Sequence, residues 1–434
     1  NGESSKKLFK PLQPLCLSLA IMAKYDVIVW GATSFVGKLT ARYLAETYGV
    51  NKDLKWAIGG RSIDKLNSVK QQLGEEGSQL QTFVGDSKDI SFLDDMVQQT
   101  KVVITTVGPY LLYGKELAEA CAKNGTDYCD LTGEVPFVHN VRKTCEEPAK
   151  RSGARILNCC GFDSIPSDLG VFYLNEVSKK VHGEGIKNAS SQFYAAKGGF
   201  SGGTLASFNE MFKLAKRDSS VAKLLRNPFC LCPEGKQSGA RQPKWDAVRQ
   251  CTITKRWLAP FVMAPVNSRV VLSSNALLDY PYTKDFEYEE KSGVKSAFAA
   301  YGAKIGMGAA FGMLSIQPIF NLMTKFFLPK PGEGPSEEAQ RSGFFKADIV
   351  GETVSGKQVG VKVTGDRDPG YGSTAKMLGE VGVCLARDVS KESVRGGVWT
   401  PASALGNKLV SRLVANAGLT FEQTLPSVTQ KSSL

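Results

Sequence analysis

The stretch Tyr25-Asp-Val-Ile-Val-Trp-Gly-Ala-Thr-Ser-Phe-Val-Gly37 joins a short apolar run to a turn of the form Gly-x-x-Ser-x-x-Gly. The apolar run predicts a buried strand, and residues 38–47 after the turn predict a helix. Gly31 would let the backbone turn sharply and approach a pyrophosphate, while Gly37 would let the helix pack closely on the strand. The N–H groups at the start of this helix are donors for the phosphates. We therefore predict a dinucleotide-binding loop made of Gly31, Ala32, Thr33, Ser34, Phe35, Val36 and Gly37.

The next apolar run suggests which dinucleotide binds. It covers residues 54–58 and is followed by Gly59-Gly-Arg-Ser62. Proteins that bind NAD usually end this strand with Asp or Glu, which accepts hydrogen bonds from the ribose hydroxyls. Arg61 and Ser62 instead offer a cation and a hydroxyl to a 2′-phosphate, so the sequence favours NADP, with NAD as the alternative. Arg61 could also be an ordinary solvated side chain at the end of a strand.

The same pattern of an apolar run followed by Gly and polar residues recurs at residues 80–86, 101–110, 127–134 and 154–163. Apolar strands that alternate with helical segments predict an α/β fold with a doubly wound parallel sheet. Ligands of such sheets bind at the carboxyl ends of the strands. We therefore assign Asp86, Gly108 and Pro109 to the cofactor site, and propose as proton donors Tyr110, Glu134 and Asp163.

Each proposed proton donor also has a structural interpretation. Asp163 precedes Ser164-Ile-Pro-Ser167 and could hold a turn before the next helix. Glu134 could cap the helix that follows Pro136, and Tyr110 could stack on the cofactor. The sequence leaves these alternatives open.

Composition excludes several classes of protein. With 434 residues, the chain is long enough for two or three domains. Ten cysteines without regular short spacing indicate an intracellular, reducing compartment rather than secretion. No metal site is predicted, because there is no Cys-x-x-Cys pair and the two histidines are His139 and His182.

Pro-, Gly- and charge-rich breaks divide the chain into five parts. We predict that residues 1–21 are a disordered extension and that residues 22–170 are a Rossmann domain binding NAD(P). Residues 186–365 form a second α/β domain that contains the hydrophobic segment 293–330. A helical segment, 366–421, returns to the Rossmann domain, and residues 422–434 form a tail.

The net charge of +12 is concentrated between Lys213 and Arg256, where 11 basic and three acidic residues occur. This stretch could be a solvated loop, or it could bind an anionic membrane or a phosphorylated carrier. Nucleic acid is not expected, because no recognition motif accompanies the charge.

An uncharged run, Ile305–Thr324, follows the basic stretch. Its length of 20 residues would suffice to cross a bilayer, but Pro318 and several glycines interrupt it. A packed helix, a hairpin on a membrane surface and a true span are the three alternatives. The neighbouring basic stretch favours the membrane surface, since cations and an apolar anchor would act together.

Several motifs together resemble those of the saccharopine dehydrogenase-like oxidoreductases, over about residues 22–421. They are the glycine loop, Gly60-Arg-Ser62, Thr106-Val-Gly-Pro-Tyr110, Tyr128-Cys-Asp-Leu-Thr-Gly-Glu134, Gly161-Phe-Asp-Ser-Ile-Pro-Ser-Asp168, Pro331-Gly-Glu-Gly-Pro335, Asp368-Pro-Gly-Tyr371 and Gly397-Val-Trp-Thr-Pro401. One departure is Ser34, where many relatives have Gly, and we expect it to shift or weaken the phosphate contact.

The resemblance implies a Rossmann domain, a second α/β domain and a homodimer formed through it. The chain is similar to the branch that contains bacterial trans-acting enoyl reductases of lipid synthesis and membrane or lipid-droplet proteins. Two hypotheses follow. The chain is an NADP-dependent oxidoreductase of a lipid-linked or amino-acid-derived small molecule at a membrane, lipid droplet or mitochondrion, or it is a membrane-associated protein that keeps the nucleotide fold without turnover.

Overall fold

A computed structural model describes residues 23–198, 207, 210, 211, 213, 214, 216–314, 316, 318 and 334–426. The predicted extension, residues 1–21, lies outside the described residues. So do residues 427–434 and most of 315–330.

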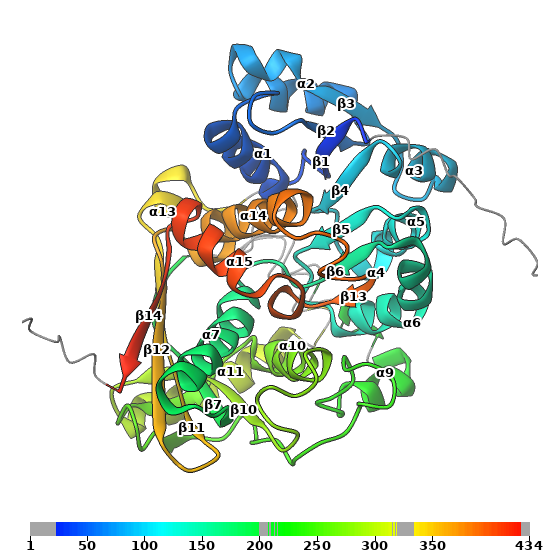
Figure 1. Cartoon of the computed structure of the whole chain (residues 1–434). Helices are drawn as coiled ribbons and strands as arrows, with labels where there is room; N and C mark the ends of the chain where they lie inside the picture. Colours follow the sequence, from blue (N-terminus) through cyan, green and yellow to red (C-terminus); the bar gives the residue numbers. More distant parts are fainter. Residues whose placement is uncertain are drawn as a thin grey trace, which may run out of the picture.

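The first sheet is the predicted doubly wound parallel sheet. Its strand order is β13-β6-β5-β4-β1-β2-β3, and every neighbouring pair is parallel. This is the Rossmann order 3-2-1-4-5-6 with one more strand at the edge. Figure 1 shows it in the upper half of the molecule. The strands are β1 (Tyr25–Trp30), β2 (Trp56–Gly60), β3 (Gln81–Val84), β4 (Thr100–Thr105), β5 (Asp127–Asp130), β6 (Arg155–Leu157) and β13 (Gly397–Trp399).

Helices cover both faces of this sheet. Val27 and Val29 of β1 belong to the core that includes α1 and α14, while Ile28 and Trp30 face the core of α3, α5 and α6. Burial on both faces explains why the strand is continuously apolar. The helices of this half are α1 (Phe35–Tyr48), α2 (Ile63–Gln72), α3 (Ile90–Val97), α4 (Tyr110–Tyr113), α5 (Lys115–Asn124), α6 (Val135–Ser152) and α14 (Thr374–Arg387).

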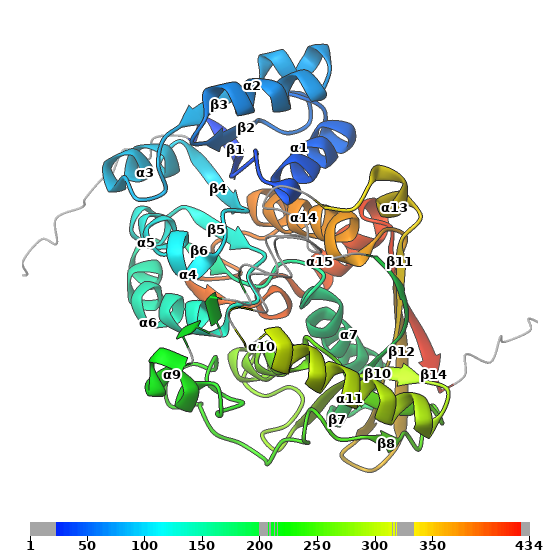
Figure 2. The ribbon, with the colours of Figure 1, turned by 180° about the vertical axis from the view of Figure 1, so that it is seen from behind.

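The second sheet is mixed, with the order β14-β12-β11-β7-β10-β9-β8. β7 and β10 are parallel and the other neighbours are antiparallel. Helices α7 and α10 pack on it, as Figures 1 and 2 show from opposite sides. The strands are β7 (Ile186–Lys197), β8 (Arg249–Gln250), β9 (Trp257–Pro260), β10 (Glu287–Val294), β11 (Phe344–Thr353), β12 (Gln358–Gly365) and β14 (Leu419–Leu425). The helices are α7 (Ile165–His182), α9 (Ser219–Leu224), α10 (Ala264–Leu277), α11 (Ala297–Leu314), α13 (Glu337–Arg341) and α15 (Pro401–Asn416).

Two boundaries differ from the sequence predictions. The predicted tail, 422–434, begins too early, because β14 pairs with β12 up to Leu425. The sequence pattern did not indicate this strand, because Glu422 is exposed and its neighbours are polar. Its inward-facing residues, Leu419 and Phe421, are buried. The segment 366–421 is not only helical, since its residues 397–399 form β13 at the edge of the first sheet.

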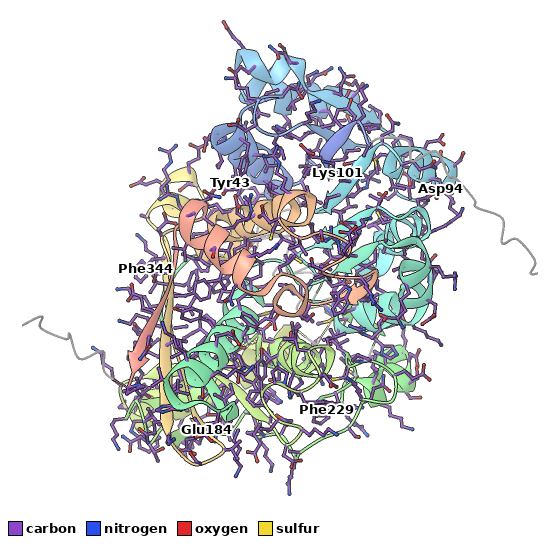
Figure 3. The ribbon with its side chains drawn as sticks, in the orientation of Figure 1. Tyr43, Asp94, Lys101, Glu184, Phe229 and Phe344 are labelled. Carbon is purple, nitrogen blue, oxygen red and sulfur yellow. The ribbon has the colours of Figure 1, made fainter. Side chains whose placement is uncertain are left out.

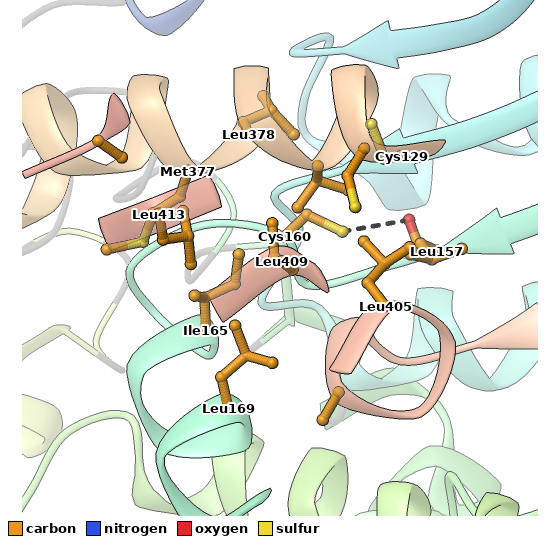
Figure 4. Packing of buried hydrophobic residues seen from close by; sticks show 14 of the residues in the cluster. Cys129, Leu157, Cys160, Ile165, Leu169, Met377, Leu378, Leu405, Leu409 and Leu413 are labelled. Atoms are coloured by element: carbon orange, nitrogen blue, oxygen red, sulfur yellow. Dashed lines mark hydrogen bonds between the residues drawn. The ribbon is translucent and has the colours of Figure 1, made fainter. Parts of the chain in front are cut away.

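The two sheets share one hydrophobic core. Figure 4 shows residues of β5 and β6 together with α7, α14 and α15, including Cys129, Leu169, Leu378 and Leu409. A hydrogen bond joins α1 to α14: Tyr43 of α1, labelled in Figure 3, donates to the buried Glu380 of α14. The core therefore fixes the first sheet relative to α7.

Helix α11 packs on β9 with one face and exposes apolar side chains on the other. Phe298 is 90% exposed and Ile305 is 72% exposed. In the part of the chain that the structure describes, no helix has the length and hydropathy needed to span a membrane.

Candidate functional site

The glycine loop has the geometry that the sequence predicts. Gly31 follows β1 with φ +84°, in the left-handed region, and a Cβ there would lie 2.6 Å from Val107 Cγ2. A Cβ on Gly37 would lie 2.2 Å from the carbonyl oxygen of Gly31. Both positions therefore need glycine, the first for backbone conformation and the second for close helix packing.

Ser34 takes part in the loop through its side chain. It is the N-cap of α1, and its Oγ accepts a hydrogen bond of 2.9 Å from the amide of Gly37. The same Oγ lies 2.8 Å from Thr106 Oγ1, which is 2.9 Å from the carbonyl oxygen of Gly31. Thr106, which the sequence reasoning missed, thus ties the loop to the end of β4.

The residues present fit a dinucleotide. The amides of Phe35 and Val36 open α1 and have no intrahelical acceptor, so they are the donors left for a pyrophosphate once Ser34 has taken Gly37. The bond between Ser34 Oγ and the Gly37 amide is thus a physical basis for the shifted phosphate contact that we expect from serine at this position. Ala32 is buried beneath the loop and Thr33 is half-buried.

The end of β2 carries the predicted selectivity residues. Arg61 is exposed and has no hydrogen bond or ion pair with any described residue. Ser62 is the N-cap of α2, where its Oγ accepts from Lys65 N at 3.4 Å. A free guanidinium beside a helix N-terminus suits a 2′-phosphate. Asp86 is exposed beyond β3, where it accepts from Lys88 N.

Glu134 and Tyr110 are joined to each other rather than left free. Glu134 is buried and accepts from the amides of Tyr110 at 3.0 Å and Leu111 at 2.7 Å, and from Ser207 Oγ at 2.6 Å. Its side chain therefore caps α4, the helix after the cis Gly108–Pro109 peptide. Glu134 is also the N-cap residue of α6, but its side chain makes no capping hydrogen bond there. Burial raises the pKa of Glu134.

The phenol of Tyr110 is also engaged. Tyr110 is 4% exposed, its hydroxyl donates to the carbonyl of Thr105 at 3.1 Å, and its ring contacts Phe137. To stack on a cofactor, the Tyr110 ring would have to leave its buried position beside Phe137. The proton-donor role of Tyr110 and Glu134 stays a prediction, and their contacts favour a supporting role.

Asp163 differs from these two groups. It lies between β6 and α7 at the carboxyl edge of the first sheet, is half-buried, and has no hydrogen bond or ion pair with the described residues. Burial raises its pKa to about 6. A carboxyl group that is partly protonated near neutral pH and has free oxygen atoms is suited to donate a proton. Among the three predicted groups, the geometry therefore favours Asp163, whose role stays a prediction.

A further buried carboxylate holds together the segments that follow β5 and β6 at the carboxyl edge of the first sheet. Asp130, at the end of β5, accepts from Asn158 Nδ2 at 2.6 Å, from the Tyr128 hydroxyl at 2.9 Å, and from the amides of Thr132 and Cys159. Burial raises its pKa to about 6. It was missed because its partners come from β5 and from the segments that follow β5 and β6; its place at a strand end was the available signal. The described residues contain no group of three or more His, Cys, Asp or Glu side chains able to hold a metal.

Comparison with known proteins gives the family. Residues 27–156 match the saccharopine dehydrogenase NADP binding domain. A Mycobacterium tuberculosis protein, whose name assigns it provisionally as a trans-acting enoyl reductase, is 38% identical over 413 residues, covering 92% of this chain and 98% of the relative. The trans-acting enoyl reductase of Mycobacterium ulcerans is 35% identical over 408 residues, covering 90% of this chain and 96% of the relative.

Among solved structures, the apo saccharopine dehydrogenase (L-Glu forming) of Saccharomyces cerevisiae is similar with a TM-score of 0.47 and 12% identity, covering 92% of this chain and 99% of that one. The matched domain gives the cofactor as NADP, in agreement with Arg61 and Ser62. By its likeness to relatives along nearly its full length, the chain belongs to the saccharopine dehydrogenase-like family of oxidoreductases.

Proposed function

We propose that this protein uses NADPH to reduce a carbon–carbon double bond of a lipid-linked substrate, at the surface of a membrane or lipid droplet. The observation that carries the reaction is the 38% identity, over 92% of the chain, to a relative named for enoyl reduction. NADPH, when bound, supplies hydride to one carbon of the double bond and leaves as NADP⁺. A proton must reach the other carbon, so that one C–C π bond is replaced by two C–H bonds.

The residues of this chain would hold the cofactor and deliver that proton. The loop of Gly31 and Gly37 receives the pyrophosphate, and Arg61 receives the 2′-phosphate. Asp163 lies at the same edge of the sheet, and its carboxyl oxygens have no partner among the described residues. Its position supports its assignment as the proton donor.

The reaction can be tested with purified full-length protein, by following NADPH oxidation at 340 nm, the standard absorbance, on trans-2-enoyl thioesters of increasing chain length. A cyclic imine panel serves as the amino-acid-type comparison, and Gly31→Val serves as the control without a cofactor loop. We expect turnover with long-chain enoyl thioesters only. Turnover with imines alone would overturn the enoyl assignment. No oxidation of NADPH with either panel would favour the nucleotide-binding protein without turnover.

The membrane part of the proposal rests on α11. Phe298, Tyr301 and Ile305 follow one another at helical spacing and are 90%, 55% and 72% exposed. Exposed apolar groups in a row are a mark of an interaction surface. Two exposed cations are carried by neighbouring segments: Lys295 precedes the helix, and Lys255 lies in the turn between β8 and β9, the strand on which α11 packs. Apolar anchors beside basic residues favour an anionic lipid surface.

Vesicle flotation tests this surface. Phe298→Asp with Ile305→Asp should abolish binding to phosphatidylserine-containing vesicles, because each side chain would contribute about 1.5–3 kcal/mol on entering lipid. Both side chains are exposed, so folding should be unaffected. Val414→Asp is the matched control, since Val414 is an exposed apolar residue, 49% accessible, on α15. Equal flotation of the α11 variant and the control would refute the assignment of this face.

A further inference from the structure

Two motifs from the second half of the chain meet at the cofactor loop. Phe35, whose amide is one of the donors left for a pyrophosphate, is half-buried at the start of α1. Its ring packs edge-on against Tyr371 of the motif Asp368–Tyr371, with the two ring centroids 5.1 Å apart. Gly334, of the motif that ends at Pro335, also lies against this ring, because a Cβ there would collide with it. A segment from far later in the chain therefore packs on the loop that would receive the pyrophosphate.

Tyr371 belongs to a tight, hydrogen-bonded turn. Residues Pro369–Ser373 form a single π-helical turn that leads directly into α14. The buried Asp368 accepts from the amides of Tyr371 at 3.1 Å and Gly372 at 3.0 Å. Turns of this kind are rare and are frequently found at functional sites. These hydrogen bonds fix Tyr371 relative to Thr374, the first residue of α14.

Thr374 in turn holds the loop that carries Asp163. It is 4% exposed, and its Oγ1 accepts from the amide of Phe162 at 3.0 Å and donates to the carbonyl of Pro369 at 3.0 Å. Its methyl group occupies the space beside Gly161, where a Cβ would lie 3.1 Å from Thr374 Cγ2. The side chain of Thr374 thus fixes the peptide that directly precedes Asp163. Helix α14, which Thr374 opens, lies against α1 and against β4 and β5 (Figure 1).

The ring of Phe162 anchors the same loop on the second sheet. Its centroid lies 4.8 Å from that of Phe345 on β11 and 5.8 Å from that of Phe193 on β7. This packing does not depend on the hydroxyl of Thr374. Loss of that hydroxyl should therefore loosen the loop of Asp163 without unfolding it.

We propose that the segment Asp368–Thr374 is a positioning element for the reduction, which makes NADPH binding at the glycine loop order the loop of Asp163. A pyrophosphate on the first amides of α1 would restrain Phe35 and, through the ring contact, Tyr371. Because the turn is closed by its own hydrogen bonds, the restraint reaches Thr374 at its other end. The inference rests on the proposed function and names how cofactor binding prepares its proton donor.

Hydrogen exchange on the full-length protein tests this coupling without substrate. The exchange of the Phe162 amide, resolved by electron-transfer dissociation, is measured with and without saturating NADPH. Thr374→Val removes the acceptor of this amide at nearly constant volume, and Thr374→Ser keeps the hydroxyl. Thr40→Val is the matched control, because Thr40 is also buried but its Oγ1 has no hydrogen-bond partner among the described residues. Tyr371→Leu removes the ring contact with Phe35, and Tyr371→Phe keeps the ring.

The Thr374 variants test the hydrogen bond to the donor loop. Thr374→Val should speed exchange of the Phe162 amide by about 2- to 13-fold, the range expected for the loss of one hydrogen bond. Thr374→Ser and Thr40→Val should exchange at the wild-type rate. Equal rates in Thr374→Val and wild type would overturn the assignment of Thr374.

The Tyr371 variants test the coupling itself. In wild type and Tyr371→Phe, NADPH should slow exchange of the Phe162 amide. In Tyr371→Leu the Kd for NADPH should rise by about 2- to 13-fold, as for the loss of one aromatic pair, and saturating NADPH should no longer slow that exchange. If Tyr371→Leu does not fold, Phe35→Leu removes the same contact from the half-buried side and decides in its place. NADPH that slows exchange equally with and without the ring contact would overturn the coupling.

Turnover tests the positioning role. With a trans-2-hexadecenoyl thioester, kcat should fall by about 10- to 100-fold in Thr374→Val and recover in Thr374→Ser, because a misplaced proton donor slows the chemical step. The Kd for NADPH should change less than kcat does, because Tyr371 still contacts Phe35 in this variant. Equal kcat in Thr374→Val and Thr40→Val would overturn the positioning role. If wild-type protein oxidises no NADPH, the proposed function fails, and hydrogen exchange alone decides on the segment.

Discussion

Replacing Arg61 by alanine should change cofactor selectivity and little else. The guanidinium is exposed at the end of β2 and has no partner among the described residues, so its loss should alter the free energy of unfolding by less than about 0.5 kcal/mol. A charge-assisted contact with the 2′-phosphate is worth about 1.5–3 kcal/mol. Since about 1.4 kcal/mol is tenfold in affinity, the Kd for NADPH should rise by roughly 10- to 150-fold.

The experiment is a fluorescence titration with NADPH and NADH at fixed ionic strength, which needs no substrate. NADH has no 2′-phosphate, so its Kd should be equal in wild type and Arg61→Ala. Arg151→Ala is the control. This arginine is also exposed, but it lies in the last turn of α6, away from the end of β2 that carries Arg61. An unchanged NADPH affinity in Arg61→Ala, or an equal loss for NADH, would refute the reasoning.

Four other predictions follow from the site. Gly31→Val should abolish NADPH binding in the same titration while far-UV circular dichroism still shows a folded chain, because a side chain at φ +84° would meet Val107. Glu134→Gln should lower the free energy of unfolding by about 1–3 kcal/mol in urea denaturation, because an amide oxygen cannot replace both carboxylate acceptors of the α4 amides. Asp163→Asn should lower kcat by about 10²–10⁴-fold with the Kd for NADPH unchanged; an equal fall in NADPH affinity would instead indicate a structural role. The contribution of the buried Glu290 of β10 to stability should fall as the pH rises from about 4.5 to about 7, because burial raises its pKa to about 7 and it therefore binds more protons in the folded state. The contribution lost is at most about 3 kcal/mol, and Glu290→Gln should remove it from the pH dependence of urea unfolding.

The strands of the first sheet could be predicted because the signal for each strand lies in a few consecutive residues. Its strands are buried on both faces and therefore form continuous apolar runs such as Val27–Trp30. Each run ends in glycine or a polar residue, where a ligand edge is expected. Gly31 and Gly37 could be assigned for the same reason, since each is required by backbone geometry that lies within seven residues.

Contacts between distant segments could not be predicted. Strand β13 has three residues, too few for a periodic signal, and it is defined by pairing with β6 about 240 residues earlier in the chain. Glu134 is the N-cap residue of α6, as one alternative had it, but its carboxylate accepts from the amides of Tyr110 and Leu111 instead, far back in the sequence. For α11, hydropathy indicates an apolar helix but not that Phe298 would face outward.

The start of α7 shows the same limit at the candidate site, and the shared core explains why its placement is nevertheless fixed. Leu169 of α7 belongs to the same buried cluster as Leu378 of α14 and Leu409 of α15, so α7 cannot shift relative to the first sheet without opening this core. Truncating a fully buried leucine of this kind costs about 2–5 kcal/mol, which is a large part of a domain's stability. The helix that is anchored there begins directly after Asp163. The position of this carboxyl group is therefore set by the packing of α7 between the two sheets as well as by the loop that carries Asp163.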